Sequence, residues 1–109
     1  MFKFNHIISD INTEFVCAIN NNIIGWLDYS QLDNNIHINA IFVDNKYRNK
    51  KIATKLLDMC LTTFKNYNIS LQVFPFRDKP MCINKLKNFY FKYKFVEDTY
   101  NKNLLKLTR

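Results

Sequence analysis

The hydrophobic pattern of the chain changes its period just after Asp44, and this change limits the possible folds more than any other feature. Before it, short apolar segments alternate with polar turns, a pattern typical of an antiparallel meander. After it, apolar residues recur at the spacing of an amphipathic helix. The strands predicted before the change cover residues 2–8, 14–19, 23–32 and 36–43.

Beyond Asp44 the pattern predicts helices that alternate with strands. The first helix carries an apolar stripe made of Ile52, Ala53, Leu56, Leu57, Cys60, Leu61 and Phe64. A strand over 69–74 follows, and Pro80 suits the first turn of a second helix. One face of that helix is expected to hold Cys82, Leu86, Phe89, Tyr90 and Tyr93. A last strand over 104–107 gives the order β-β-β-β-α-β-α-β, which predicts an α+β fold with helices packed on a mixed sheet.

The size and composition of the chain indicate a single folded domain, which we expect to span residues 1–109. The sequence is 48% hydrophobic and 16% aromatic, which excludes a disordered chain. No apolar run is long enough to cross a bilayer, and we expect neither a signal peptide nor a membrane partner. Cys17, Cys60 and Cys82 are odd in number and widely spaced, so we expect free thiols in a reducing, cytoplasmic setting.

Charge is distributed unevenly along the chain. Residues 1–45 hold one basic and five acidic residues, whereas residues 46–109 hold fifteen basic and four acidic residues. This split suggests that the second half meets an anion and that the first half meets a cation. Surface lysines that simply face water are the ordinary alternative.

The most informative segment is the junction at which a strand passes through a polar turn directly into the first helix. The first amides of a helix have no internal partner and carry the positive end of its dipole. A phosphate placed there gains several hydrogen bonds at once, and basic residues raise the local potential further. The basic residues of this junction are Arg48, Lys50, Lys51 and Lys55.

This junction resembles the acetyl-CoA signature of the GNAT superfamily of N-acetyltransferases, Arg/Gln-x-x-Gly-x-Gly/Ala after a strand. Here the segment is Arg-Asn-Lys-Lys-Ile-Ala over residues 48–53. Arg48 and Ala53 match the signature, whereas Lys51 stands where the family usually has glycine, a residue that lets the backbone approach a phosphate closely.

Two further segments resemble the same family in the same order. Ile-Ile-Gly-Trp over residues 23–26 is similar to its third strand. The segment 88–95 is similar to its late signature Phe-Tyr-x-x-apolar-Gly-Phe, with Lys94 in place of glycine. The resemblance covers roughly residues 14–96 and implies a compact member with a GNAT-like mixed sheet, an antiparallel meander followed by β-α-β-α-β.

The resemblance also implies a reaction, the direct transfer of an acetyl group from acetyl-CoA to a primary amine without a metal. In the family, the fourth and fifth strands diverge, and the pantetheine arm pairs with the exposed backbone of the fourth. By position, that backbone is Ile41, Phe42 and Val43. The pyrophosphate would lie beside Arg48 on the amides of Asn49, Lys50, Lys51, Ile52, Ala53 and Thr54.

Two residues are candidates for moving protons in this reaction. His37 stands where the family commonly has a glutamate base, and an ordinary imidazole has a pKa of ~6.5, which suits that task. A simple strand histidine, with ordered water as the base, is the alternative. Tyr90 falls on the family's tyrosine, which can protonate the leaving thiolate, and its alternative is a core aromatic in a stripe with Phe89 and Tyr93.

The family usually places one or two helices between its first two strands, whereas only Ser9–Thr13 separates those strands here. The acceptor site is therefore expected to be open or to be completed by a partner, with a homodimer as one possibility. The acidic first half is expected to face a cationic acceptor, such as a lysine side chain, a protein N-terminus or a polyamine. The acidic residues concerned are Asp10, Glu14, Asp28 and Asp33.

Two other functions remain open alongside the enzyme. Lysines at both glycine positions favour a catalytically degenerate GNAT-fold interaction module. A basic helix with interleaved aromatics is compatible with a nucleic-acid-binding domain, although aromatics on one apolar stripe should be buried. The residues of that helix are Lys85, Lys87, Tyr90, Lys92, Tyr93 and Lys94.

Several kinds of chemistry are not expected. His6 and His37 are the only histidines and lack the spacing of metal ligands, so we expect no metal. Gly25 is the sole glycine, which excludes a Walker phosphate loop. Cys82 is expected to be a buried, inert thiol rather than a nucleophile.

Overall fold

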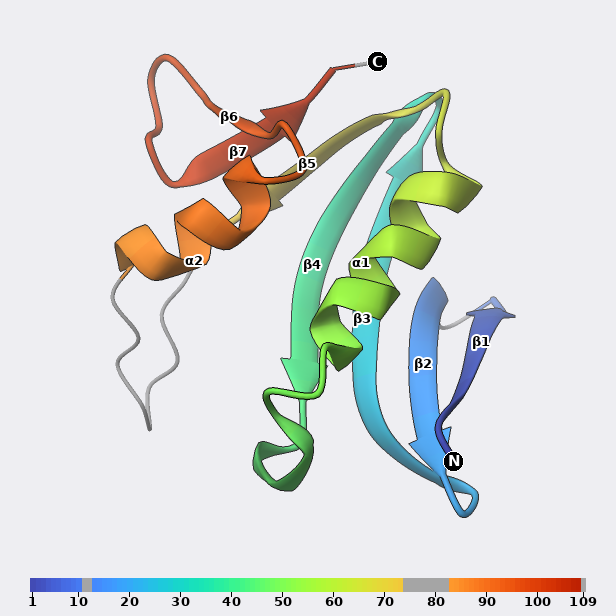
Figure 1. Cartoon of the computed structure of the whole chain (residues 1–109). Coiled ribbons are helices and arrows are strands. Elements are labelled where there is room, and N and C mark those ends of the chain that lie inside the picture. The colour runs from blue at the N-terminus through green and yellow to red at the C-terminus, as the bar shows by residue number, and fades with distance from the viewer. Residues whose placement is uncertain (11–12, 74–82, 109) are drawn as a thin grey trace.

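The computed structural model describes residues 1–10, 13–73 and 83–108 (Figure 1). The strands of these residues are β1 (Lys3–Ile8), β2 (Thr13–Ile19), β3 (Asn22–Leu32), β4 (Asn35–Val43), β5 (Asn68–Gln72), β6 (Val96–Glu97) and β7 (Leu104–Leu107). The helices are the single-turn η1 (Asn45–Tyr47), α1 (Ile52–Thr63) and α2 (Ile83–Phe91). The sequence pattern predicted every element except η1 and β6.

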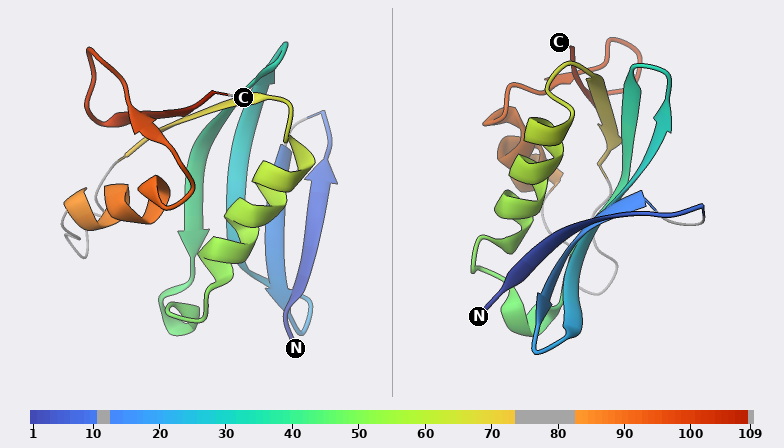
Figure 2. Two further views of the ribbon diagram at one scale, coloured as in Figure 1. Left: turned by 45° about the horizontal axis from the view of Figure 1, so that its top comes forward. Right: turned by 90° about the vertical axis from the view of Figure 1, so that its right-hand side faces the viewer.

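The described strands form one mixed sheet in the order β1-β2-β3-β4-β5-β7-β6. The first four strands are the predicted antiparallel meander, β4 and β5 are parallel, and β5, β7 and β6 are antiparallel neighbours. The helices α1 and α2 lie on the same face of this sheet, and the opposite face carries no described α-helix (Figure 2). The α+β fold expected from the sequence is therefore confirmed, and we call the uncovered face the open face.

Three details differ from the sequence prediction. Tyr93 lies beyond the end of α2, in the turn that follows it, rather than in the helix. The strand predicted over 69–74 ends at Gln72, and Phe74 lies outside the described residues, as do Pro80 and Cys82. The strand β6 has only two residues, which is too short for an alternating pattern, so the sequence does not predict it. Its pairing with β7 identifies it in the structure.

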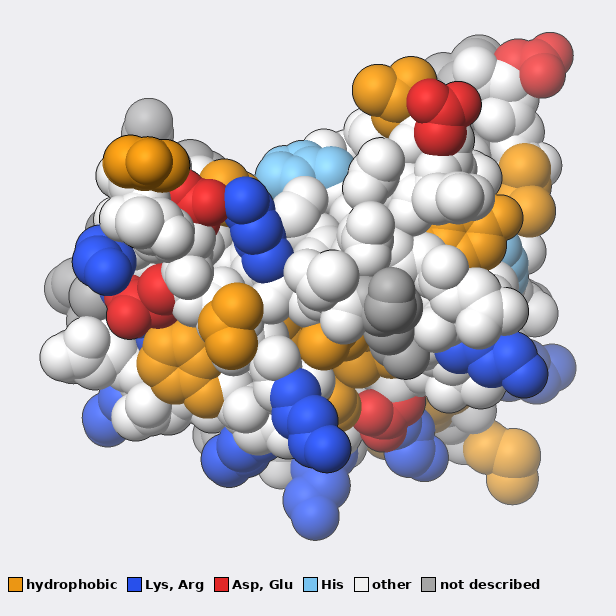
Figure 3. Space-filling model, turned by 90° about the horizontal axis from the view of Figure 1, so that it is seen from above, with side chains coloured by type: hydrophobic (Ala, Val, Ile, Leu, Met, Phe, Trp, Pro, Cys, Tyr) orange, Lys and Arg blue, Asp and Glu red, His pale blue; other side chains and the backbone are white. Residues whose placement is uncertain are grey.

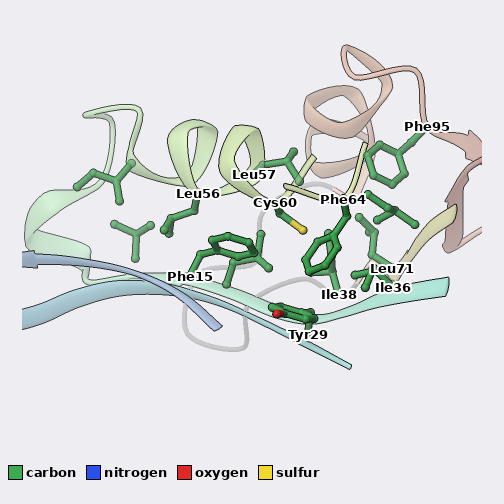
Figure 4. Close-up of a cluster of buried hydrophobic side chains, with 14 of the residues drawn as sticks. Phe15, Tyr29, Ile36, Ile38, Leu56, Leu57, Cys60, Phe64, Leu71 and Phe95 are labelled. Atoms are coloured by element: carbon green, nitrogen blue, oxygen red, sulfur yellow. The ribbon is translucent and has the colours of Figure 1, made fainter. Parts of the chain in front are cut away.

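The core lies between α1 and the sheet (Figure 4). Leu56, Leu57 and Cys60 from the predicted stripe of α1 are fully buried, and they pack with side chains such as Phe15 of β2 and Ile36 of β4. Burial of each large apolar side chain stabilises the fold by about 1.5–3 kcal/mol. The alternation of β2 to β4 and the helical stripe of α1 therefore meet in one apolar layer.

The tight turns of the meander depend on asparagine and aspartate rather than on glycine. Asn20 and Asn21 have φ angles of 51° and 66° in the two-residue turn between β2 and β3. Positive φ at both central residues matches the right-handed twist of the flanking strands. Asp33 has a φ of 54° at the start of the next turn. Asparagine and aspartate accept this conformation because their side chains hydrogen-bond to the nearby backbone.

Gly25 lies where β3 meets both the end of β4 and the start of α1. A Cβ atom at this position would lie 3.1 Å from the carbonyl oxygen of Phe42 and 3.4 Å from Cγ2 of Ile52. A larger residue would therefore push β4 or α1 away from β3. The absence of a side chain at Gly25 allows the close approach on which the strand-to-helix junction depends.

We predict that Gly25→Val lowers the free energy of unfolding by about 2 kcal/mol, because the added atoms overpack this junction. Urea unfolding followed by circular dichroism measures the change. Ile23→Val on the same strand is a matched control, because Ile23 is 52% exposed and its substitution should change stability by less than about 0.5 kcal/mol. Equal stability of the Gly25→Val variant and the wild-type protein would show that the close approach has no energetic weight.

Candidate active site

A bulge in β4 aims the end of this strand at the helices. Asp28 pairs with Ala40 and Tyr29 pairs with Ile38, so that Asn39 is an extra residue in β4. A β-bulge shifts the side-chain alternation by one residue. Ile36 and Ile38 face the core before the bulge, and Ile41 and Val43 face the same side after it.

The same end of β4 loses its partner on one edge. On the side of β5, β4 pairs only from Asn35 to Ile38, and the two strands then diverge (Figure 1). No described strand pairs with residues 40–43 along that edge. This edge is therefore open to pairing with an extended ligand, the role that the sequence analysis expects of Ile41, Phe42 and Val43, although the Val43 carbonyl oxygen accepts a hydrogen bond from Arg48 Nε.

Short hydrogen bonds shape the turn between β4 and α1. The Asp44 amide donates to the carbonyl oxygen of Ile24 at 2.7 Å, and the Asp44 carboxylate accepts from the Lys46 amide at 3.2 Å. Arg48 Nε donates to the carbonyl oxygen of Val43 at 3.0 Å. Arg48 therefore holds the turn against the end of β4, a structural role that its match to the signature did not reveal.

Two residues of this turn have left-handed backbone conformations. Asn49 has a φ of 66°, and Lys51 has a φ of 61° and a ψ of 25°. Lys51 stands at a position that glycine fills in the signature, and it takes the conformation for which glycine is usually needed. Lys94, which replaces the second glycine, has a φ of 71°. The chain therefore keeps left-handed backbone at both positions without glycine.

The N-terminus of α1 has no side-chain cap. Lys51 is the N-cap residue, and its side chain makes no capping hydrogen bond. The first turn of α1 contains no acidic residue. The first amides of the helix are therefore available to an anion, which the helix dipole also favours.

A cavity of about 440 Å³ lies between the end of β4, the start of α1 and α2. Its described lining residues are Ile41, Val43, Tyr47, Arg48, Asn49, Lys51, Ile52, Ala53, Thr54, Lys85, Leu86, Phe89 and Tyr90. This set contains three cationic residues and no acidic one. The cavity therefore combines an apolar channel with a positive potential, which suits a ligand that has both an apolar arm and phosphates.

Most of the site residues predicted from the sequence meet in this cavity. Phe42 and Lys50 are absent from the described lining. The Phe42 ring stacks on Trp26 with centroids 4.5 Å apart, and the stack belongs to the open face because Phe42 alternates with Ile41 and Val43. The sequence analysis did not assign four lining residues to this site, namely Tyr47, Lys85, Leu86 and Phe89. For Leu86 and Phe89 the sequence held a signal, because their helical spacing places them on the same face of the second helix as Tyr90.

Tyr90 is a half-buried tyrosine on the cavity side of α2. Its ring makes edge contacts with Phe89 at 5.1 Å and Phe95 at 5.9 Å between centroids. Burial raises the pKa of Tyr90 to about 12. Its hydroxyl therefore stays protonated at neutral pH and can donate a hydrogen bond to a group in the cavity.

The turn after α2 is attached to α1 through Tyr93. Its side chain hydrogen-bonds to Thr54 and Asp58 of α1, and burial raises its pKa. Because Thr54 also lines the cavity, this contact connects the two helices that form the cavity wall. Tyr93 also contacts the Phe89 ring, with centroids 5.7 Å apart, and Phe89, Tyr90 and Tyr93 all pack against the hydrophobic core.

His37 does not line the cavity with Tyr90. It lies before the bulge on the open face, where its Nδ1 is 2.8 Å from Oγ of Ser70 on β5. Asn39 donates to Oγ of Ser30 at 2.9 Å on the same face. The structure therefore places the two predicted proton-transfer residues on different faces of the sheet.

The open face, which carries His37 and Asn39, also carries a pair of acidic residues. Glu14 of β2 and Asp28 of β3 are direct partners across the two strands. Neither forms an ion pair with a described residue. Seen from above, most Lys and Arg side chains lie along the lower edge, the side of the helices (Figure 3). An acidic side chain also lies among them, so the lower edge is predominantly but not wholly basic in this view (Figure 3).

The described part of the chain contains no group of three metal-ligating side chains, and none of its helices is long and apolar enough to cross a membrane. Cys17 and Cys60 are buried free thiols, and burial raises the pKa of Cys17. The expectation for Cys82 lies outside the described residues.

Comparisons with known proteins agree with this geometry. A family model described as the acetyltransferase (GNAT) family matches residues 3–82. The chain is similar to the structure of paia N-acetyltransferase from Thermoplasma acidophilum in complex with coenzyme A, with 20% identity and a TM-score of 0.69. That alignment covers 88% of this chain but only 59% of the other, so this chain spans less than two thirds of that protein.

Two other solved structures show the same fold. An acetyltransferase of the GNAT family from Staphylococcus aureus Mu50 has 27% identity and a TM-score of 0.66, covering 87% of this chain and 66% of that one. The ribosomal-protein-S18-alanine N-acetyltransferase from Escherichia coli has 10% identity and a TM-score of 0.75, covering 98% and 93%. No curated protein sequence gives a significant match.

The raised pKa of Tyr90 predicts a loss of stability in alkaline solution. The unfolded phenol ionises at about 10 and the folded one at about 12, so its contribution is fully present below pH 10 and is lost between these values. We expect the free energy of unfolding to fall over this interval by about 2 kcal/mol more in the wild-type protein than in Tyr90→Phe. Urea unfolding at each pH measures this difference. Parallel pH profiles for the two proteins would contradict the burial of the hydroxyl.

Proposed function

The chain belongs to the acetyltransferase (GNAT) family, and from that membership we propose that it is an N-acetyltransferase that moves an acetyl group from acetyl-CoA to a primary amine. The observation that carries the proposal is the cavity in which the end of β4 that β5 leaves unpaired, the uncapped start of α1 and Tyr90 meet. The single enzyme domain of residues 1–109 is part of the same proposal.

The donor would bind along the two features that lack internal partners. The pyrophosphate would accept hydrogen bonds from the first amides of α1, with Asn49 to Thr54 around it. The pantetheine arm would extend along the backbone of residues 41–43, where β5 has diverged. Hydrogen bonds at both ends would hold the thioester in a fixed position, which is a main source of rate acceleration in group transfer.

Acetyl transfer then requires two proton movements. The neutral amine attacks the thioester carbonyl carbon, the carbon–nitrogen bond forms, and the carbon–sulfur bond breaks to release a thiolate; the nitrogen loses one proton, which balances the proton that the sulfur gains. Tyr90 is protonated and lines the cavity, so its hydroxyl can donate a hydrogen bond or a proton to the departing sulfur. Its position among the lining residues supports this role, and its ring also packs against the hydrophobic core.

The proton of the incoming ammonium has two possible acceptors. His37 lies on the open face beside Ser70 and would act on an amine that approaches from that face. Ordered water is the alternative base, and it would not require His37 to reach the cavity. Replacement of His37 by glutamine distinguishes them, because the acidic limb of the pH–rate profile changes only if the imidazole is the base.

The acceptor is proposed to be cationic. Glu14 and Asp28 repel each other across the strands, and a bound ammonium group would relieve this repulsion. The open face is accessible because the short Ser9–Thr13 connection replaces the helices that usually cover it. A lysine side chain, a protein N-terminus or a polyamine would fit this description, and a second copy of the chain is a possible cover for the remaining surface.

Two alternatives are less well supported by the geometry. The interaction module was favoured by lysines at both glycine positions, but Lys51 and Lys94 keep the left-handed backbone that the signature needs. The nucleic-acid domain required exposed aromatics on α2, whereas Phe89 and Tyr90 are half-buried and line the cavity. The buried free thiols Cys17 and Cys60 are compatible with the proposed reducing, cytoplasmic location.

Donor binding can be tested by introducing a negative charge at the start of α1. Ala53→Glu should weaken acetyl-CoA binding by at least about tenfold, because the carboxylate repels the phosphates. The fold should tolerate it, since an acidic residue is favourable in the first turn of a helix. Isothermal titration calorimetry measures the affinity, and Thr62→Glu near the other end of α1 is the matched control. Equal affinities for the two variants would place the phosphates elsewhere.

Catalysis by Tyr90 can be tested separately from binding. Tyr90→Phe should lower kcat by about 10²-fold while the KM for acetyl-CoA changes by less than about twofold. Release of the CoA thiol in the presence of a panel of amines measures the rate. Tyr100→Phe is the control because Tyr100 is 96% exposed and is not among the described lining residues of the cavity. An unchanged kcat would remove the acid role from Tyr90.

A further inference from the structure

The two edges of the described sheet differ in how well they resist pairing with another strand. The edge strand β6 has two residues, and its Glu97 forms an ion pair with Lys87 of α2 at 2.8 Å. The other edge strand, β1, has six residues, among which are one lysine and no proline or acidic residue. Short or charged edge strands resist pairing, whereas a long edge with unpaired backbone groups favours it. A further strand can therefore add at β1.

The outer side of β1 has no partner in the described part of the chain. β1 pairs with β2 in a regular antiparallel register from Lys3–Ala18 to Ile8–Thr13, without a bulge. No described strand lies on its other side, where β1 forms the edge of the sheet (Figure 1). Ile7 is 36% exposed and Ile8 is 71% exposed. An added strand would cover part of this apolar surface and satisfy the backbone groups beside it.

We propose that a second copy of the chain docks on this edge, with the two β1 strands antiparallel about a twofold axis at Asn5. The axis is normal to the sheet, so the open faces of both copies lie on the same side. Lys3 of each copy then lies opposite Ile7 of the other copy. Phe4 lies opposite His6 in the same way. The contact is symmetric and closes with two copies, which gives a dimer rather than a filament.

Charge favours this register. Glu14 of β2 is the direct partner of Ile7, and Asp28 of β3 is the direct partner of Glu14. Lys3 of the second copy continues this row beyond Ile7, about 10 Å from Glu14 between Cα atoms at the usual strand spacing. An extended lysine and a glutamate can meet across that distance. Neither Lys3 nor Glu14 forms an ion pair with a described residue of its own copy. Two symmetric ion pairs therefore join the copies, and Asp28 remains to attract the amine acceptor.

Other registers with a twofold axis lose this match. If the axis lay at His6, Lys3 would face Ser9, which lies beyond the end of β1. If the axis lay at Phe4, only the residues from Lys3 to Asn5 of the two strands would overlap. The axis at Asn5 pairs five residues of each strand and is the one that brings Lys3 into the row of Glu14.

The test is the dimer dissociation constant, measured by sedimentation equilibrium at low salt without acetyl-CoA. The wild-type protein should dimerise as its concentration rises. Lys3→Glu and Glu14→Lys should each weaken the dimer by at least about tenfold, because each brings like charges together. The double variant exchanges the two charges and should restore the affinity to within about threefold. Lys65→Glu makes the same change of charge at an exposed residue just after α1 and should change the affinity by less than about twofold.

A further variant protects the edge without reversing a charge of the proposed pair. Ile7→Lys places an ammonium group beside Glu14 in the same copy and opposite Lys3 of the second copy, so this variant should stay monomeric. Because Ile7 is 36% exposed, the fold should tolerate the change, which circular dichroism and thermal unfolding check.

Three results would overturn the proposal. They are a wild-type protein that stays monomeric, a dimer that neither single charge reversal weakens, and a charge exchange that fails to restore the dimer. None of them bears on acetyl transfer, because association is measured without the donor and the variants leave the lining residues of the cavity unchanged.

Discussion

The extra residue in β4 is the constraint on which the candidate site depends. If β4 ran through Asn39 as a regular strand without a bulge, its alternation would turn the side chains of Ile41 and Val43 toward the open face. The cavity would then lose its apolar floor, and Phe42 would point into it instead of stacking on Trp26. Divergence of β4 from β5 begins at the same place, after Ile38, so one local irregularity sets both the side chains and the free backbone of the site.

The turn that follows depends on a different kind of constraint. Asn49 and Lys51 are both held in left-handed conformations, which asparagine tolerates but which cost about 1–3 kcal/mol for a residue such as lysine. The surrounding hydrogen bonds, including that from Arg48 to Val43, maintain this geometry. A chain with one glycine in 109 residues has therefore kept the geometry of a glycine-rich signature while changing its side chains. Strained backbone retained beside a cavity is consistent with a site that binds a ligand.

Much of the fold could be predicted from the sequence because its two layers have different periods. Alternating patterns predict β2 from residues 14–19 and β4 from residues 36–43. The helical stripe from Ile52 to Phe64 predicts α1. The bulge could not be predicted, because Asn39 and Ala40 are polar and small in either register. The position of the candidate site followed from the junction between β4 and α1, but its far wall did not, since no local pattern shows that Lys85 of α2 reaches the same cavity.

The arrangement of both helices on one face has a consequence for how the molecule unfolds. A sheet covered on one side has a single apolar layer, and α1 supplies the helical half of that layer against β2, β3 and β4. Detachment of α1 exposes the apolar side chains of β2, β3 and β4 that lie beneath it, so this part of the core and the helix open together. Amide protons at the centre of α1 and of β3 should therefore exchange with solvent through one common opening, as a single cooperative unit.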